Sequence, residues 1–136
     1  MCGFIAIFNS HSTSNNIENM LQSIKHRGPD SSKIVKKNNW QLGFNRLGIV
    51  GRNSLFDQPY SEDAKTYLLF NGEIYNYRDL SKKYFPGFFA ESDTQVLYKL
   101  LMLKHESILP ELDGIFSFVF VDTFNDSVIA GRDQFG

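Results

Sequence analysis

The chain has 136 residues, 42% of them hydrophobic, and its 14 basic and 15 acidic side chains leave a formal net charge of −1. This composition suits one domain with a buried core, and the balanced charge gives no indication of a nucleic-acid partner. The single cysteine excludes an intramolecular disulfide scaffold and favours a reducing compartment, so we expect a cytoplasmic protein.

The N-terminal stretch MCGFIAIF lacks a basic segment and is too short for a signal peptide or a membrane span. Its apolar run over residues 3–8 therefore predicts a buried strand. From Asn15 to about Lys25 the apolar residues return at helical spacing. The expected apolar face of this helix consists of Ile17, Met20, Leu21 and Ile24. The motif HRGPD ends the helix, with Gly28 at its C-terminus and Pro29 unable to continue it.

The next segments favour strands. SKIVKK and WQLGFNRLGIV are rich in β-favouring residues, and Asn38 and Asn39 divide them like a turn, so we expect a pair of strands. TYLLFNGEIYNY predicts a strand that stops at Asn71-Gly72, followed by a short helix near residues 78–84.

The last third of the chain has the clearest local signals. Ser92 and Gln95 match a capping box. The helix expected after it has an apolar face that includes Val96, Leu97, Leu100 and Leu101. GIFSFVFVD and SVIAGRD then predict two strands joined by the turn TFND, which together form an antiparallel hairpin. Strands and helices do not alternate regularly, so an α+β fold on antiparallel sheet is favoured.

Cys2 is the first candidate for chemistry. Removal of Met1 would give one residue both a thiol and a free α-amine, with ordinary pKa values of about 8.5 and about 8, so the amine can accept the thiol proton. This is the arrangement used by hydrolases with an N-terminal nucleophile. The alternative is that Cys2 is a small, buried strand residue, which is the usual environment of a free cysteine.

Asn71 and Gly72 are candidates for stabilising an oxyanion. A side-chain amide and the backbone N–H of a glycine that allows close approach are suitable donors to the negative charge that develops in acyl transfer. The alternative is a type I′ turn, because Asn-Gly is common in hairpins.

Arg46 and Asp93 could bind the α-carboxylate and the α-ammonium group of an amino-acid substrate. Each also has an ordinary structural explanation. Arg46 could be a surface ion-pair partner, and Asp93 could be a favourable charge in the first turn of a helix.

Taken together and in this order, the motifs resemble the glutaminase domain of class II glutamine amidotransferases, which have an N-terminal nucleophile. The residues of HRGPD and NGEIYN are most similar to those of the glutamine-hydrolysing asparagine synthetase branch. The motifs that carry the resemblance are MCGFIAIF, HRGPD, NRLGIV, QP, FNGEIYNY, SDTQVL, LDGIFSFVFVD and GRDQFG, and they cover the whole chain.

The resemblance implies that Cys2 is the nucleophile after Met1 is removed. The Asn71 side chain and the Gly72 N–H would then form the oxyanion hole, and Arg27 of HRGPD would contact and support the nucleophile. The implied reaction is hydrolysis of glutamine to glutamate and ammonia through a γ-glutamyl thioester.

The resemblance also implies how glutamine is bound. Arg46 would hold its carboxylate, Asp93 and Glu73 would contact its amino end, and Asn71 and Gly72 would also contact it. The backbone expected to line the pocket belongs to Leu47, Gly48, Ile49 and Val50.

The family fold is a four-layer αββα sandwich of two antiparallel sheets. Members continue past RDQFG into further strands and a separate synthetase domain, so over residues 1–136 we expect a glutaminase domain that lacks its last strands and its synthetase partner. ATP and Mg²⁺ are expected only in that partner, with no cofactor or metal in this domain. The expected partners are glutamine and a synthetase domain or subunit that makes asparagine, not nucleic acid or membrane. The alternatives are a catalytically impaired fragment that binds glutamine or another chain, and an amidotransferase for another carboxylate acceptor such as a sugar acid.

Overall fold

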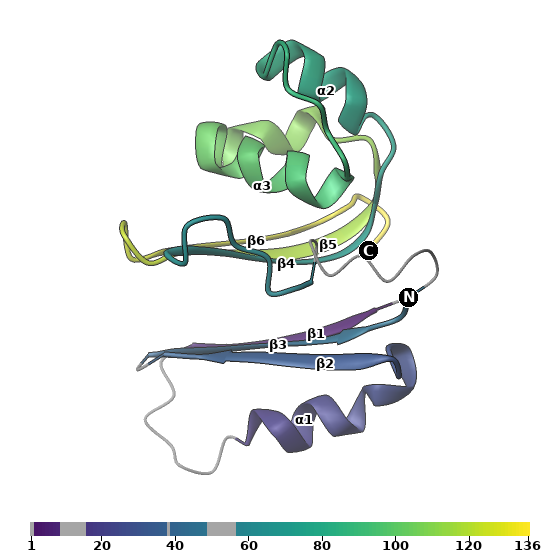
Figure 1. Ribbon diagram of the computed structural model, residues 1–136, viewed down its shortest axis with the longest axis vertical. Coiled ribbons are helices and arrows are strands. Elements are labelled where there is room, and N and C mark those ends of the chain that lie inside the picture. The colour runs from purple at the N-terminus through teal and green to yellow at the C-terminus, as the bar shows by residue number, and fades with distance from the viewer. Residues whose placement is uncertain (1, 9–15, 38, 49–56) are drawn as a thin grey trace.

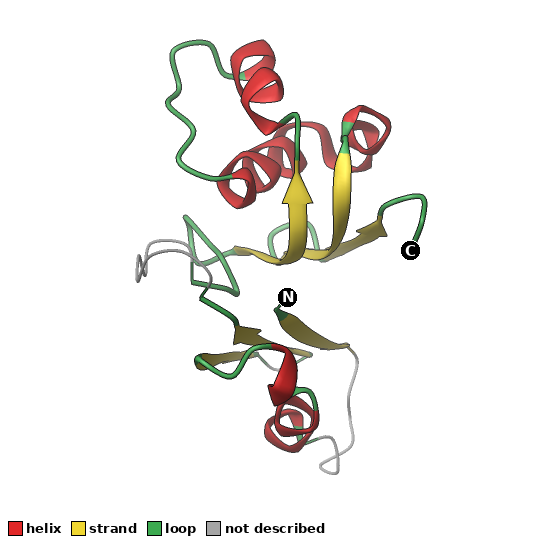
Figure 2. Ribbon diagram, turned by 90° about the vertical axis from the view of Figure 1, so that its right-hand side faces the viewer, coloured by secondary structure: helices red, strands yellow, loops and turns green. Residues whose placement is uncertain are grey.

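The computed structural model describes residues 2–8, 16–37, 39–48 and 57–136. They form four layers, in which two antiparallel three-stranded sheets stack face to face and helices cover both outer faces (Figure 1). Figure 2, turned by 90°, shows the same order of helix, sheet, sheet and helices. The α+β prediction and the four-layer arrangement are confirmed.

The first sheet has the strand order β1-β3-β2 and contains β1 (Gly3–Phe8), β2 (Ser31–Lys36) and β3 (Trp40–Arg46). The predicted pairing of the second and third of these strands is confirmed. β3 ends at Arg46, however, so the strand is shorter than the apolar pattern suggested.

Helix α1 (Ile17–Ser23) covers the outer face of this sheet through Ile17 and Leu21, which are both buried. The expected helix was too long, because α1 stops at Ser23 and a 3-10 turn over Lys25–Arg27 follows before Gly28. Met20 was also wrongly assigned to the buried face. It is 42% exposed, because the short helix can turn only a narrow stripe toward the sheet.

The second sheet has the strand order β4-β5-β6 and contains β4 (Thr66–Ile74), β5 (Gly114–Asp122) and β6 (Ser127–Arg132). The predicted hairpin of the last two strands is confirmed. The predicted stop of β4 at Asn71-Gly72 is wrong, since the strand continues to Ile74 and stays paired with β5. Asn71-Gly72 is therefore not a type I′ turn.

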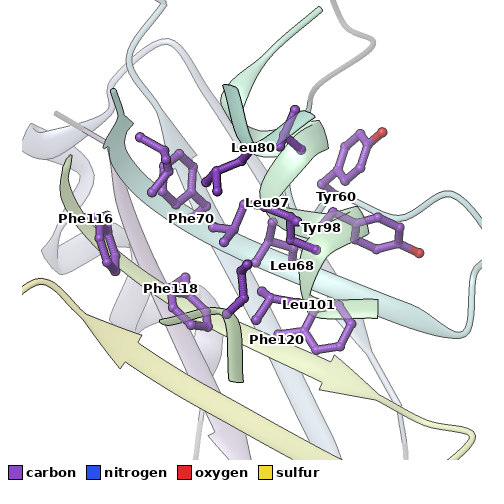
Figure 3. Packing of buried hydrophobic residues seen from close by; sticks show 14 residues of the cluster. Tyr60, Leu68, Phe70, Leu80, Leu97, Tyr98, Leu101, Phe116, Phe118 and Phe120 are labelled. Carbon is purple, nitrogen blue, oxygen red and sulfur yellow. The ribbon is translucent and has the colours of Figure 1, made fainter. Parts of the chain in front are cut away.

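Helices α2 (Tyr77–Tyr84) and α3 (Asp93–Lys104), with a 3-10 segment over His105–Glu111, cover the outer face of the second sheet. The predicted capping box is present in part, because the Ser92 side chain accepts from the Gln95 N–H at 3.1 Å. The Gln95 side chain in turn accepts from the Glu91 N–H instead of that of Ser92. The main core lies between these helices and the sheet (Figure 3), and all four predicted apolar residues of α3 are buried there.

A second, smaller core fills the space between the two sheets. Its buried members are Leu42, Phe44, Tyr67, Leu69 and Val121, and Cys2 packs against it. Because side chains alternate along a strand, β4 points residues 68 and 70 toward the helices and residues 67 and 69 toward the other sheet. None of the helices within the described residues is long and apolar enough to cross a bilayer.

Candidate active site

Cys2 lies immediately before β1 and is half-buried against the core between the sheets. The Leu47 N–H donates to its Sγ at 3.4 Å, and the Leu47 carbonyl oxygen lies 3.9 Å from the same sulfur. On the other side, the Arg27 Nε–H donates to the Cys2 carbonyl oxygen at 3.2 Å. The thiol and the backbone of Cys2 are thus held by two different segments, and Arg27 has the expected contact with this residue.

The HRGPD segment packs against the end of β3. A Cβ on Gly28 would lie 2.2 Å from the Asn45 carbonyl oxygen, so only glycine fits there. The Asp30 N–H donates to the Arg46 carbonyl oxygen at 3.0 Å, and the Asp30 carboxylate accepts from the Gly48 N–H at 2.6 Å. These bonds fix the backbone on both sides of Leu47, the residue that contacts the thiol.

Gly72 lies on the open edge of β4, the edge that faces away from β5. Three other N–H groups of β4 point to this edge. The Leu68 N–H donates to the Tyr60 carbonyl oxygen and the Phe70 N–H donates to Gln58 Oε1. The Ile74 N–H donates to Asp93 Oδ2. The Gly72 N–H points the same way because alternate residues of a paired strand share one edge. Among the described residues no acceptor is found for this N–H, so the part of the chain that the structure describes leaves it available to a ligand.

The conformation at Gly72 also requires glycine. Its φ of 143° lies in a region that L-residues rarely adopt, and an added Cβ would lie 2.1 Å from the Ile115 carbonyl oxygen. This close approach is to the neighbouring strand, and the approach of the Gly72 N–H to an oxyanion stays a prediction.

Asn71 is half-buried and lies on the same face of β4 as Tyr67 and Leu69. This face points toward the core between the sheets, and Cys2 packs against the same core. In Figure 1 the N-terminal end of β1 and the end of β4 that leads to α2 lie on the same side of the sandwich. The structure therefore brings Cys2, Asn71 and Gly72 to one end of the two sheets. Glu73 belongs to this end as well, and it is exposed.

Arg46 is the last residue of β3 and forms an ion pair with Asp57, with 2.5 Å between Nη1 and Oδ1. The ion-pair interpretation of Arg46 is thus correct, and its position next to Leu47 also places it at the same end of the molecule. Sequence reasoning missed Asp57. The only available signal was its place directly before the QP motif.

Asp93 is the first residue of α3, and its carboxylate accepts from the Ile74 N–H at 3.1 Å and from the Thr94 N–H at 2.7 Å. Burial raises the pKa of Asp93, and the nearby negative charge of Glu73 raises it further, whereas the backbone hydrogen bonds act in the opposite direction. Asp93 therefore does more than support the helix dipole, because it joins α3 to the edge of β4 two residues beyond Gly72.

The expected pocket backbone is described only in part. Leu47 and Gly48 lie beside Cys2 and Asp30, whereas Ile49 and Val50 lie outside the described residues. Within the described ranges no three His, Cys, Asp or Glu side chains form a group suited to a metal ion. The arrangement contains a thiol, an N–H donor, a side-chain amide, a guanidinium and the carboxylates of Asp57, Glu73 and Asp93, and these groups suit an amino-acid amide.

The family model described as glutamine amidotransferase domain matches residues 1–136. An asparagine synthetase [glutamine-hydrolyzing] of Sandersonia aurantiaca is 38% identical over 143 residues, which cover 100% of this chain and 27% of that protein. Asparagine synthetase [glutamine-hydrolyzing] 1 of Bacillus subtilis (strain 168) is 38% identical over 147 residues, covering 100% of this chain and 23% of that protein.

The nodule asparagine synthetase [glutamine-hydrolyzing] of Pisum sativum is likewise 38% identical over the whole chain, which covers 24% of it. The chain thus spans about a quarter of the length of these relatives. The family model matches all 136 residues given, and the chain belongs to the glutamine amidotransferase domain family.

Proposed function

We propose that this chain is a glutaminase domain that hydrolyses the side-chain amide of glutamine to glutamate and ammonia. The observation that carries the proposal is the N–H of Gly72, for which the described residues offer no acceptor, at the same end of the sandwich as Cys2. An available donor beside a nucleophile is what acyl transfer needs, because negative charge develops on the former carbonyl oxygen.

The reaction begins once removal of Met1 has freed the α-amine of Cys2. The amine takes the thiol proton, and the sulfur attacks the amide carbon of glutamine. The resulting oxyanion accepts hydrogen bonds from the Asn71 side chain and the Gly72 N–H. Its collapse breaks the C–N bond, and the protonated α-amine gives its proton to the leaving amide nitrogen, which departs as ammonia. Water then attacks the γ-glutamyl thioester, which releases glutamate and restores the thiol.

The remaining residues of the site hold the substrate. Arg46 binds the α-carboxylate through its guanidinium, and Asp93 with Glu73 binds the α-ammonium group, as their charges suit. Backbone of residues 47–50 lines the pocket. No cofactor takes part in these steps.

We further propose that the ammonia is used by an ATP- and Mg²⁺-dependent synthetase module to convert aspartate to asparagine in the cytoplasm. The names of the relatives support this assignment, because each combines asparagine synthesis with glutamine hydrolysis. The activity of the synthetase module and the identity of the ammonia acceptor are tested by supplying aspartate and ATP to the intact protein and measuring asparagine.

The glutaminase proposal is tested by glutamate release from glutamine. Cys2→Ala is expected to lower the rate by at least about 10³-fold, and Asn71→Ala to lower kcat by about 10²-fold with a smaller change in KM. Intact-mass measurement of the native protein reports whether Met1 has been removed. Hydrolysis that proceeds equally well in Cys2→Ala would overturn the proposal.

A further inference from the structure

Asp57 begins a short segment that is attached to the open edge of β4. Tyr60 and Leu68 exchange two backbone hydrogen bonds of 2.8 Å, and the Gln58 side chain accepts from the Phe70 N–H. The segment runs antiparallel to β4, so its earlier residues lie nearer to Gly72. Asp57 is therefore at the end of the segment that approaches the site.

From this position Asp57 reaches the opposite sheet. Its carboxylate pairs with Arg46, which is the last residue of β3, and the two side chains are 36% and 25% exposed. The ion pair thus joins the edge of the second sheet to the end of the first. It lies near Cys2, because Leu47, which follows Arg46, donates its N–H to the Cys2 Sγ.

An arginine side chain has many rotamers, and holding it in one of them before the substrate arrives removes part of the entropic cost of binding. A guanidinium has five N–H donors, more than one carboxylate uses. A carboxylate on the protein, here that of Asp57, can therefore fix the direction in which the Arg46 guanidinium extends.

We propose that Asp57 is a positioning residue that orients the Arg46 guanidinium for the α-carboxylate of glutamine, and so sets the preference for substrates that carry this group. The inference rests on the proposed function. A carboxylate beside the guanidinium also repels an incoming carboxylate, and if that repulsion dominated, removing the charge of Asp57 would tighten binding.

The test is the steady-state kinetics of glutamine hydrolysis by Asp57→Asn in the intact protein. We expect KM to rise about 3- to 10-fold, because the Arg46 side chain would have to be ordered when glutamine binds. The kcat should stay within about twofold of the native value. Asp57→Glu, which keeps the charge, should recover part of the KM. For 4-aminobutanamide, which lacks the α-carboxylate, kcat/KM should be the same in the native protein and in Asp57→Asn.

Glu62→Gln is the matched control, because Glu62 lies in the same loop and forms an ion pair of similar exposure with Lys99, at 2.7 Å. It should leave KM unchanged. A KM for Asp57→Asn that stays within twofold or falls, or a loss of kcat that Asp57→Glu does not restore, would overturn the proposal. Hydrolysis that is independent of Cys2 would instead overturn the proposed function, so the two failures are distinguishable.

Discussion

At the scale of single residues, two glycines show what a sequence can indicate about this site. Gly72 was singled out as a position where the chain needs glycine, and its φ of 143° together with the nearby Ile115 carbonyl shows that only glycine fits. The expected approach of its N–H to an oxyanion stays a prediction. Gly28 was expected at the C-terminus of a helix, and it follows the 3-10 turn over Lys25–Arg27. Its φ is −150°, so the requirement for glycine comes from space, because an added Cβ would lie 2.2 Å from the Asn45 carbonyl oxygen. A local pattern identifies such a glycine, but only the tertiary contact explains it.

Asp93 gives a pH-dependent prediction. Below the ordinary aspartate pKa of about 3.9 both the folded and the unfolded chain carry the proton. Because burial raises the pKa of Asp93 in the folded chain, the unfolded chain loses this proton first as the pH increases. Between the unfolded and the folded pKa the free energy of unfolding therefore falls with increasing pH. Above the raised pKa its contribution no longer changes.

Asp93→Asn cannot ionise, so its free energy of unfolding relative to the native protein should increase from about pH 4 upward and then level off. The substitution also replaces one carboxylate oxygen by an NH2 group, so either the Ile74 or the Thr94 N–H loses its acceptor. This loss lowers the free energy of unfolding by an amount that does not depend on pH. The informative measurement is therefore the change of this difference with pH, from urea unfolding of both proteins. A difference that stays constant between pH 4 and 7 would contradict the prediction.

At the scale of elements, the start of α3 depends on one side-chain hydrogen bond, from the Gln95 N–H to Ser92 Oγ. Ser92→Ala should lower the free energy of unfolding by about 1 kcal/mol, the usual cost of losing an N-cap. Ser92→Asp keeps an acceptor at this position and should retain most of the stability. Chemical denaturation of the three proteins measures both effects, and equal losses in the two variants would show that the cap is not the cause.

The elements that were predicted correctly carry their signals within a few residues. The cap of α3, its apolar face and the TFND turn between β5 and β6 are examples. The end of β4 could not be predicted in this way. The strand continues past Gly72 because β5 supplies a partner as far as Gly114, where a Cβ would lie 2.1 Å from the Glu73 carbonyl oxygen. That glycine is about forty residues away in sequence, so no local pattern reports the contact.

At the scale of the whole molecule, the candidate site is shared between the two sheets. Cys2, Arg27 and Arg46 belong to the layers around the first sheet, whereas Asn71 and Gly72 belong to the second. The alternation of apolar residues predicts the strands but not which faces meet, and the stacking expected here came from the family resemblance. Asp57 was missed for the same reason, because its role depends on a contact between the sheets.

This division predicts that the two cores affect function differently. Leu69 is fully buried between the sheets, and Leu100 is equally buried between α3 and the second sheet. Replacing either with Ala should lower the free energy of unfolding by about 2–5 kcal/mol, through lost burial and a cavity. Only Leu69→Ala is expected to loosen the packing that sets the distance from the thiol to the proposed oxyanion donors, Asn71 and Gly72.

A misplacement of about 1 Å between reacting groups can cost up to about 10²-fold in rate. At a temperature where both variants remain folded, Leu69→Ala should therefore reduce kcat for glutamine hydrolysis by a larger factor than Leu100→Ala, even when their stability losses are similar. Urea unfolding and steady-state kinetics on the same preparations provide the comparison. If kcat followed the stability loss alone in both variants, the relative position of the sheets would not limit catalysis.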